Sequence, residues 1–239
     1  MPVITFTRRA TEKEIIDDFN LSGTEITDTF ESIEKVNIWL GGNQVLVDSF
    51  RKCIRRIQAK SIVLHDLGCG SGDGLISLAR FARKRQVTTQ FMGVDANTHV
   101  IEMARTRSKG FPEITYQVQN IFAEAYQLEG VDIATFNLCL HHFTEQEIEQ
   151  LLKKCKAASV KAIIINDLHR HWLAYYAFHL VCWVFRSPKI AKEDGLLSIR
   201  KGFKRRELLQ MTQHITTNYR LRWRWAFRWQ LLLFLEKDR

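Results

Sequence analysis

The chain has 239 residues, 46% hydrophobic and 26% charged, a balance typical of one globular domain with a sizeable core. No apolar run reaches the roughly 18–20 residues of a membrane-spanning helix, and the amino-terminal segment lacks the apolar stretch of a signal peptide. The five cysteines are odd in number and never spaced C-x-x-C, which argues against a disulfide framework or a zinc site. We therefore expect a reducing, cytoplasmic location and no bound metal.

The net charge of +9 raises the question of a nucleic-acid partner. The basic residues that cluster are Arg51, Lys52, Arg55, Arg56, Lys201, Lys204, Arg205, Arg206 and the arginines at 220, 222, 224 and 228. They are dispersed among acids instead of forming a tail, which favours a solvated surface.

Three helices are predicted before the first strand. Thr11 and Glu14 have capping-box spacing, which predicts a helix that starts there and carries Ile15, Ile16 and Phe19 on one face. A second helix is expected over about 26–39, ending at two glycines, and a third over 45–58. Residues 1–59 would thus form an amino-terminal helical cap.

The most informative segment follows at 62–84. Three β-favouring residues lead to Asp66, then Gly68, Gly70 and Gly72 alternate ahead of a helical pattern over 74–84. Glycines allow close approach of a ligand to the backbone, and the helix N-terminus offers free N–H groups. A strand–turn–helix unit of this kind predicts a nucleotide-cofactor site.

The glycine spacing separates two cofactor classes. A dinucleotide site needs G-x-G-x-x-G, whereas this chain reads D-x-G-x-G-x-G, with Asp73 where that template has glycine. A second strand, 90–95, ends in Asp95, whose carboxylate suits the two ribose hydroxyls. NAD sites place an acid there too, so Asp95 indicates an adenosine ribose without excluding NAD.

Strands and helices then alternate. Helices are expected at 98–108 and 145–159, and strands at 114–122, 131–138 and 162–166. Such alternation predicts a parallel sheet with right-handed crossovers.

The remaining third is less regular. Residues 172–185 are strongly aromatic, which indicates a lid over an apolar substrate cavity or, alternatively, a core helix or dimer contact. A loop is expected over 194–203, ahead of another helix. Residues 219–227 and 229–235 have no helix-length segment between them and therefore predict an antiparallel hairpin, which a standard dinucleotide-binding domain lacks.

These motifs resemble the class I S-adenosylmethionine-dependent methyltransferases of small-molecule type, including those of ubiquinone and menaquinone biosynthesis and polyketide-associated ones. The resemblance implies an α/β fold with a seven-stranded Rossmann-like sheet, mostly parallel and closed by the hairpin. It assigns residues 60–239 to the cofactor domain, with a lid at about 168–203. It implies S-adenosylmethionine as the cofactor, bound by Asp66, Gly68, Cys69, Gly70, Gly72, Asp95, Ala96, Asn120, Ile121 and Asn137.

The resemblance also implies the chemistry. His141 and His142 follow the fourth strand and His169 follows the fifth, and each is a candidate general base, with His142 preferred. Alternatively, the pair only lines the pocket. We expect methylation of a hydroxyl on a small apolar, aromatic or polyketide-like acceptor. The alternatives are an RNA or DNA methyltransferase, although residues 137–140 lack the Asn/Asp-Pro-Pro-aromatic motif, and an inactive cofactor-binding protein.

Overall fold

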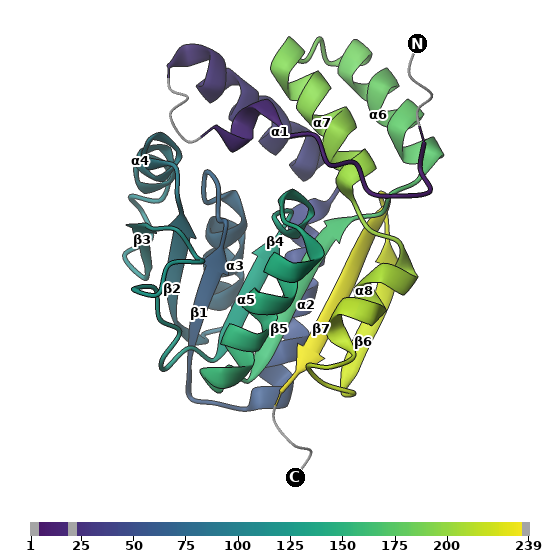
Figure 1. The fold of residues 1–239 in the computed structure, drawn as a ribbon. Helices are drawn as coiled ribbons and strands as arrows, with labels where there is room; N and C mark the ends of the chain where they lie inside the picture. Colours follow the sequence, from purple (N-terminus) through teal and green to yellow (C-terminus); the bar gives the residue numbers. More distant parts are fainter. Residues whose placement is uncertain (1–4, 19–22, 236–239) are drawn as a thin grey trace.

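The computed structural model describes residues 5–18 and 23–235. Within them, seven strands form one sheet in the order β3-β2-β1-β4-β5-β7-β6 (Figure 1). The strands are β1 (Ser61–Leu67), β2 (Thr88–Asp95), β3 (Ile114–Val118), β4 (Ile133–Asn137), β5 (Ala162–Leu168), β6 (Tyr219–Arg224) and β7 (Arg228–Phe234). The first five are parallel, and β7 is antiparallel to β5 and β6. The predicted mostly parallel sheet with its closing hairpin is confirmed.

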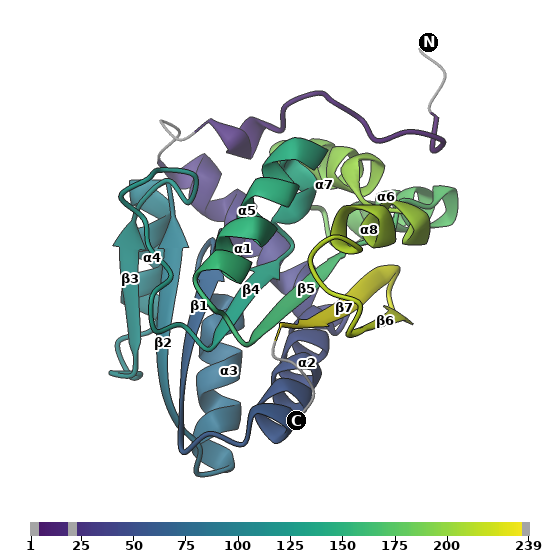
Figure 2. The same ribbon diagram turned by 60° about the horizontal axis from the view of Figure 1, so that its bottom comes forward.

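Helices cover both faces of the sheet (Figure 2). One face carries α2 (Gly42–Ile57), α3 (Asp73–Lys84) and α4 (Thr98–Arg107), and the other carries α5 (Glu145–Ala157) and α8 (Arg205–Thr212). Each face has its own cluster of buried apolar side chains. The interior strand β5 is buried on both faces, which explains the apolar run at its start.

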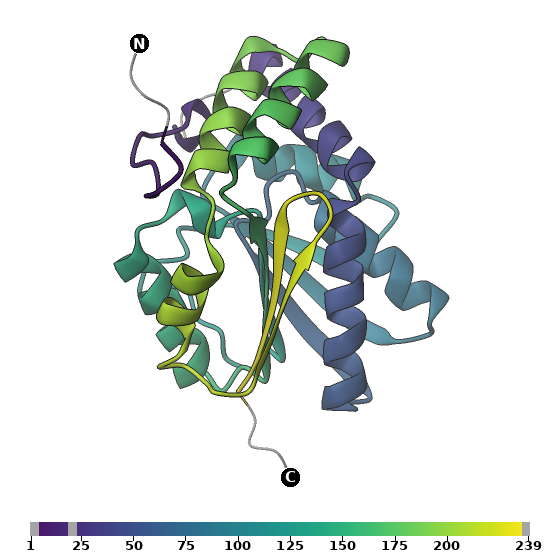
Figure 3. The same cartoon turned by 90° about the vertical axis from the view of Figure 1, so that its right-hand side faces the viewer.

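Five further helical segments lie at the carboxyl end of the parallel strands (Figures 1 and 3). They are the 3₁₀ turns η1 (Ile15–Asp17) and η2 (Leu140–His142) and the helices α1 (Thr24–Trp39), α6 (Trp172–Val184) and α7 (Lys189–Lys201). In α/β sheets this edge is where ligands bind. None of the described helices is long and apolar enough to cross a membrane.

The predicted helix starting at Thr11 is wrong. Only the 3₁₀ turn at 15–17 forms, and Glu14 takes the N-cap position. Tertiary contacts replace the local helix, because the Asp194 carboxylate accepts hydrogen bonds from the backbone N–H groups of Ile15 and Ile16. Phe19, predicted to share a face with those isoleucines, lies outside the described residues.

The loop expected over 194–203 is also wrong, because α7 continues to Lys201. Gly195, within the predicted loop, lies inside the helix. A Cβ at this position would lie 2.4 Å from the Phe178 ring, so the glycine allows α7 to pack closely against α6. β3 also ends earlier than predicted, at Val118 instead of position 122.

Two residues assigned to the basic surface are instead buried. Lys201 lies 3.1 Å from Glu14 and 3.4 Å from Asp17, measured between ammonium nitrogen and carboxylate oxygen. Arg228, at the start of β7, is only 3% exposed. Some of the basic residues that give the chain its positive net charge are therefore buried.

Candidate active site

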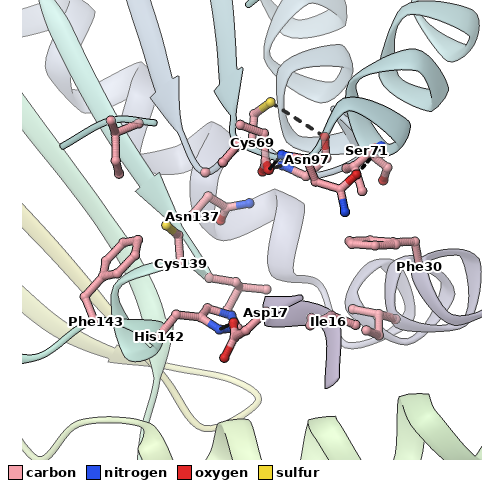
Figure 4. Close-up of a pocket in the computed structure, with 18 of the residues that line it drawn as sticks. Ile16, Asp17, Phe30, Cys69, Ser71, Asn97, Asn137, Cys139, His142 and Phe143 are labelled. Atoms are coloured by element: carbon pink, nitrogen blue, oxygen red, sulfur yellow. Dashed lines mark hydrogen bonds and ion pairs between the residues drawn. The ribbon is translucent and has the colours of Figure 1, made fainter. Parts of the chain in front are cut away.

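A cavity of about 430 Å³ opens at the carboxyl ends of β1, β2 and β4 (Figure 4). Its wall combines residues from these strand ends with residues from the amino-terminal segment and α1. The predicted cofactor residues in this wall are Gly68, Cys69, Gly70, Asp95, Ala96, Asn120, Ile121 and Asn137. We call this space the cofactor cavity.

The glycine turn gives the cavity its shape. Gly68 has a φ of +76°, and a Cβ there would lie 2.2 Å from the Cys139 sulfur, so no larger residue fits. Gly70 has a φ of +52° and open space where a Cβ would be, which leaves its backbone accessible from the cavity. Its N–H donates to Asp95 Oδ2 at 3.0 Å, and the N–H of Asn97 donates to Oδ1 at 3.1 Å. The Asp95 carboxylate is therefore held in place before any ligand arrives.

Asp66 and Gly72 lie behind the cavity wall and do not line it. Gly72 is the N-cap residue of α3. Asp66 is buried, and its Oδ1 accepts a hydrogen bond from the Thr135 hydroxyl at 2.6 Å. The net pKa of Asp66 is raised to about 7: burial is the main cause, the nearby carboxylates of Asp73 and Asp95 act in the same direction, and the Thr135 hydrogen bond opposes them.

Asn120 and Ile121 also line the cofactor cavity. The Asn120 side-chain oxygen accepts a hydrogen bond from the N–H of Phe122 at 2.9 Å, which fixes the turn. The amide NH₂ of Asn120 is therefore the group that remains for a ligand, and it is a donor.

His142 lies at the bottom of the cofactor cavity beside Asp17 (Figure 4). Its Nδ1 is 2.6 Å from Asp17 Oδ1 and 3.7 Å from Glu14 Oε1. Burial lowers the pKa of His142, but the two carboxylates outweigh it and the net shift is upward. The pairing through Nδ1 leaves Nε2 available for another group.

His141 is held by a different acid. Its Nδ1 lies 2.7 Å from Asp167 Oδ1, and its Nε2 lies 3.9 Å from Glu14 Oε1. Burial is the largest single influence and raises the pKa of Asp167, but His141, the Leu168 N–H and His142 together outweigh it, so the net shift is downward.

A second cavity, of about 340 Å³, adjoins the first. Its wall is mostly apolar and is formed by α1, α6, α7, the histidine pair and the β6–β7 turn. The two cavities share the wall residues Ile16, Ile33, Asn37, Leu138 and His142. We call the second space the acceptor cavity. His141 lines only this cavity.

His169 lines neither cavity. Its Nδ1 accepts a hydrogen bond from the Trp223 indole N–H at 3.2 Å, and its ring packs against Trp229. Burial lowers the pKa of His169 to about 4. Of the three predicted candidate bases, the structure brings only the adjacent pair to the cavities.

Glu14, His141 and His142 have the composition of a metal site, since their ligand atoms lie within 4.8 Å of one another. The Lys201 ammonium, 3.1 Å from Glu14 Oε1, already supplies positive charge there. We therefore keep the prediction that no metal binds.

Several wall residues were missed from the sequence. They are Glu14, Asp17, Phe30, Ile33, Asn37, Ser71 and Asn97. Asn97 carried a local signal, because it follows Asp95 by two positions and caps α4. The residues before position 40 carried none, since they reach the cavities only through tertiary packing.

Comparison with known proteins agrees with this geometry. Residues 64–161 match a family model described as a methyltransferase domain. No protein with curated function matches the sequence significantly.

Solved structures share the fold at low identity. The plantazolicin methyltransferase BpumL in complex with SAH is 16% identical, with 82% of this chain and 79% of that chain covered and a TM-score of 0.59. The methyltransferase domain of bacterial CtHen1-C is 19% identical, with 83% and 100% covered and a TM-score of 0.60. The citrinin polyketide synthase CMeT domain is 12% identical, with 74% and 47% covered and a TM-score of 0.57. Residues 64–161 thus match a methyltransferase-domain model, and the chain as a whole has the fold of the solved S-adenosylmethionine-dependent methyltransferases, with the glycine turn, the acid-tipped strands and the closing hairpin.

Proposed function

We propose that this enzyme transfers the methyl group of S-adenosylmethionine to a hydroxyl of a small, largely apolar, aromatic or polyketide-like acceptor. The observation that carries the proposal is the mostly apolar acceptor cavity, which joins the cofactor cavity at wall residues that include His142. A methyl donor in one cavity and an acceptor in the other would meet at this junction.

The residues of the cofactor cavity fit that donor. The backbone at Gly68 and Gly70 would lie against the methionine end, with Asp66 behind it as a source of negative charge for the cationic group. Asp95 would accept the ribose hydroxyls, because each carboxylate oxygen can accept more than one hydrogen bond. Asn120 and Ile121 would contact the adenine, while Cys69, Ala96 and Asn137 line the space between.

His142 is the base we propose. The bound sulfonium supplies a good leaving group and an electrophilic methyl carbon. His142 Nε2 would take the proton of the acceptor hydroxyl as the oxygen–carbon bond forms and the sulfur–carbon bond breaks. Asp17 at Nδ1 orients the ring and stabilises the resulting imidazolium. Because the pKa of His142 is raised, the neutral imidazole accumulates only at a pH above the ordinary pKa of histidine. His141, paired with Asp167, is the alternative base.

Small-molecule acceptors are also consistent with the structural neighbours. BpumL has been solved with a monoazolic desmethylPZN analog and SAH, and the CMeT domain belongs to a polyketide synthase. Five unpaired cysteine thiols support the proposed reducing, cytoplasmic location.

Two measurements test the proposal. Calorimetry should detect binding of S-adenosylmethionine and S-adenosylhomocysteine, and no binding of NADH. Release of S-adenosylhomocysteine should then rise with phenolic or polyketide-like acceptors. Turnover with mixed RNA, lost at high salt, would instead favour a nucleic-acid methyltransferase. Cofactor binding without turnover on any acceptor class would favour an inactive binding protein.

A further inference from the structure

Arg228 is buried, and two of its three guanidinium nitrogens find no hydrogen-bond partner among the described residues. It begins β7 and lines the acceptor cavity but not the cofactor cavity. The two nitrogens are Nε and Nη1, both of them buried, and residues 5–18 and 23–235 offer neither an acceptor. An arginine that is buried and unpaired is costly, so such groups usually have partners.

The surroundings of Arg228 do not supply the missing negative charge. A Cβ on Gly42, the first residue of α2, would lie 3.1 Å from Arg228 Cζ, so the guanidinium packs against the N-terminal end of this helix. That end carries partial positive charge and adds to the charge of the arginine. Burial lowers the pKa of Arg228 to about 10 even though Asp167 and Asp73 oppose the shift.

The two acids that act electrostatically on Arg228 are engaged elsewhere. Asp167 is paired with His141 through its Oδ1, and Asp73 Oδ2 accepts hydrogen bonds from Asn43 and Asn37. Neither forms an ion pair with Arg228 among the described residues.

We infer that Arg228 binds an anionic oxygen group of the acceptor, a carboxylate being the best match to a guanidinium. This rests on the proposed function and narrows it: the acceptor is an apolar, aromatic or polyketide-like acid. A guanidinium presents parallel N–H donors to the two oxygens of a carboxylate. With the carboxylate at Arg228, the hydroxyl to be methylated would point to His142 at the junction. An amide or ester of the same molecule has no charge to offer and should bind weakly.

The test uses 2-naphthoate and 2-naphthamide, which share one shape and differ in charge. Both are titrated by calorimetry into the full chain saturated with S-adenosylhomocysteine. We expect the acid to bind at least tenfold more tightly than the amide, and Arg228→Met to remove that preference. Thermal unfolding of Arg228→Met serves as the structural control. Because an unpaired buried charge is replaced by an apolar side chain of similar length, the variant should unfold at the same temperature or higher.

The outcomes separate this inference from the proposed function. Equal affinity for acid and amide in the wild-type chain, or a preference that survives in Arg228→Met, would overturn the anion site while cofactor binding and turnover remain as evidence for the methyltransferase. Marked destabilisation of Arg228→Met without a wild-type preference for the acid would assign the arginine a structural role. Arg222→Met, at an exposed arginine of the same hairpin, is the matched control and should bind like wild type.

A second inference rests on the surface around the mouth of the acceptor cavity. Three residues of the cavity wall are large, apolar and mostly exposed: Trp39 at 63%, Leu180 at 60% and Trp225 at 68%. The exposed apolar surface continues along α6 through Trp172, Leu173, Tyr176, Trp183, Val184 and Phe185. Five of the six tryptophans in the chain are therefore exposed, and only Trp229 is buried.

The segments that carry this surface are basic, although some of their cations pair with acids of neighbouring segments, as Lys35 does with Glu31, Lys189 with Glu193 and Arg224 with Asp48. The segments 35–47, 168–192 and 219–235, which carry these residues, contain lysine and arginine but no aspartate or glutamate. Arg186 follows Phe185 directly, and Arg222 precedes Trp223. Exposed tryptophans flanked by basic residues are typical of proteins that lie on an anionic lipid surface. We propose that α6 and the β6–β7 turn dock on such a surface, so that an apolar acceptor enters the cavity from the lipid.

Vesicle flotation tests the docking. The chain should bind vesicles of phosphatidylcholine with 30% phosphatidylglycerol, and bind pure phosphatidylcholine at least fivefold less. Two double variants should each reduce vesicle binding at least fivefold: Trp172→Ser/Trp183→Ser, which removes apolar contacts, and Arg186→Glu/Arg222→Glu, which reverses charge. Arg55→Glu/Lys84→Glu carries the same charge change at the opposite end of the sheet and should bind like wild type. Absence of binding to the anionic vesicles would overturn the proposal. A dimer in light scattering that Trp172→Ser/Trp183→Ser dissociates, without vesicle binding, would assign the surface to a second copy of the chain.

Discussion

The cofactor cavity and the acceptor cavity are built in different ways. Much of the first is formed by short segments just after β1, β2 and β4, with backbone groups and fixed carboxylates at its wall. The second is assembled from α1, α6, α7 and the β6–β7 turn, which are far apart in the sequence and present apolar side chains. A cavity built from short local segments suits a cofactor that a whole family binds. A cavity assembled from distant segments suits an acceptor that is particular to one enzyme.

Replacement of the shared residue His142 should have the largest effect. His142→Ala removes the proposed base, and positioned general bases contribute roughly 100- to 10,000-fold. We expect kcat to fall at least about 100-fold, measured as S-adenosylhomocysteine release. Cofactor affinity, measured by calorimetry, should change little in comparison. The corresponding variant His141→Ala is the control for the pair, and an equal loss of kcat in both would mean that the histidines act as a unit or that His141 is the base.

Asp95→Asn should act on the cofactor cavity alone. A hydrogen bond to a charged group contributes about 1.5–3 kcal/mol, which corresponds to roughly 10- to 150-fold in affinity for S-adenosylhomocysteine. Binding of 2-naphthoate should be unaffected once the cofactor product is saturating. Asp28→Asn, at an exposed acid of α1, is the control. If Asp95→Asn leaves cofactor affinity unchanged, the carboxylate does not bind the ribose.

Cofactor affinity should also depend on pH through Asp66. The pKa of Asp66 is raised to about 7, and a cation bound nearby favours the ionised form. The affinity for S-adenosylmethionine should therefore rise from pH 6 to pH 8, by about tenfold at most, and level off above. Calorimetry in buffers of different ionisation enthalpy should show proton release on binding near pH 7.

The control for this pH effect is Asp66→Asn, whose affinity should be lower and nearly flat across the same pH range. A wild-type affinity that falls as pH rises would contradict the assignment of Asp66. Asp66 lies behind the cavity wall and does not line it. The pH dependence therefore tests whether a buried acid can change cofactor affinity without contacting the cofactor.

The contrast between the cavities also explains what the sequence revealed. The glycine turn, Asp95 and the hairpin were predicted because each depends on residues close together in the chain. Asp17 and Glu14 were missed because their place depends on Asp194 and Lys201, about 180 positions away. The loop predicted over 194–203 was wrong for a related reason, because helix α7 there is stabilised by close packing against α6, which the small size of Gly195 allows. Local motifs thus predicted the cofactor side, while the acceptor side needed the tertiary structure.

The smallest expected effect is at the adenine end, in Asn120→Asp. The side-chain oxygen of Asn120 already accepts a hydrogen bond from Phe122, so only its NH₂ donor faces outward. Aspartate would keep the turn through one oxygen and offer a second acceptor to the adenine amino group. Asn120 is exposed, so a hydrogen bond there contributes about 0.5–1 kcal/mol, and we expect cofactor affinity to rise roughly two- to fivefold in calorimetry. Gln119→Glu, at the preceding position, adds the same charge and controls for the electrostatic contribution. A weaker cofactor affinity in Asn120→Asp would mean that the Asn120 amide donates to the adenine ring. The hydrogen bond at this position would then run from protein to adenine, not from the adenine amino group to the protein.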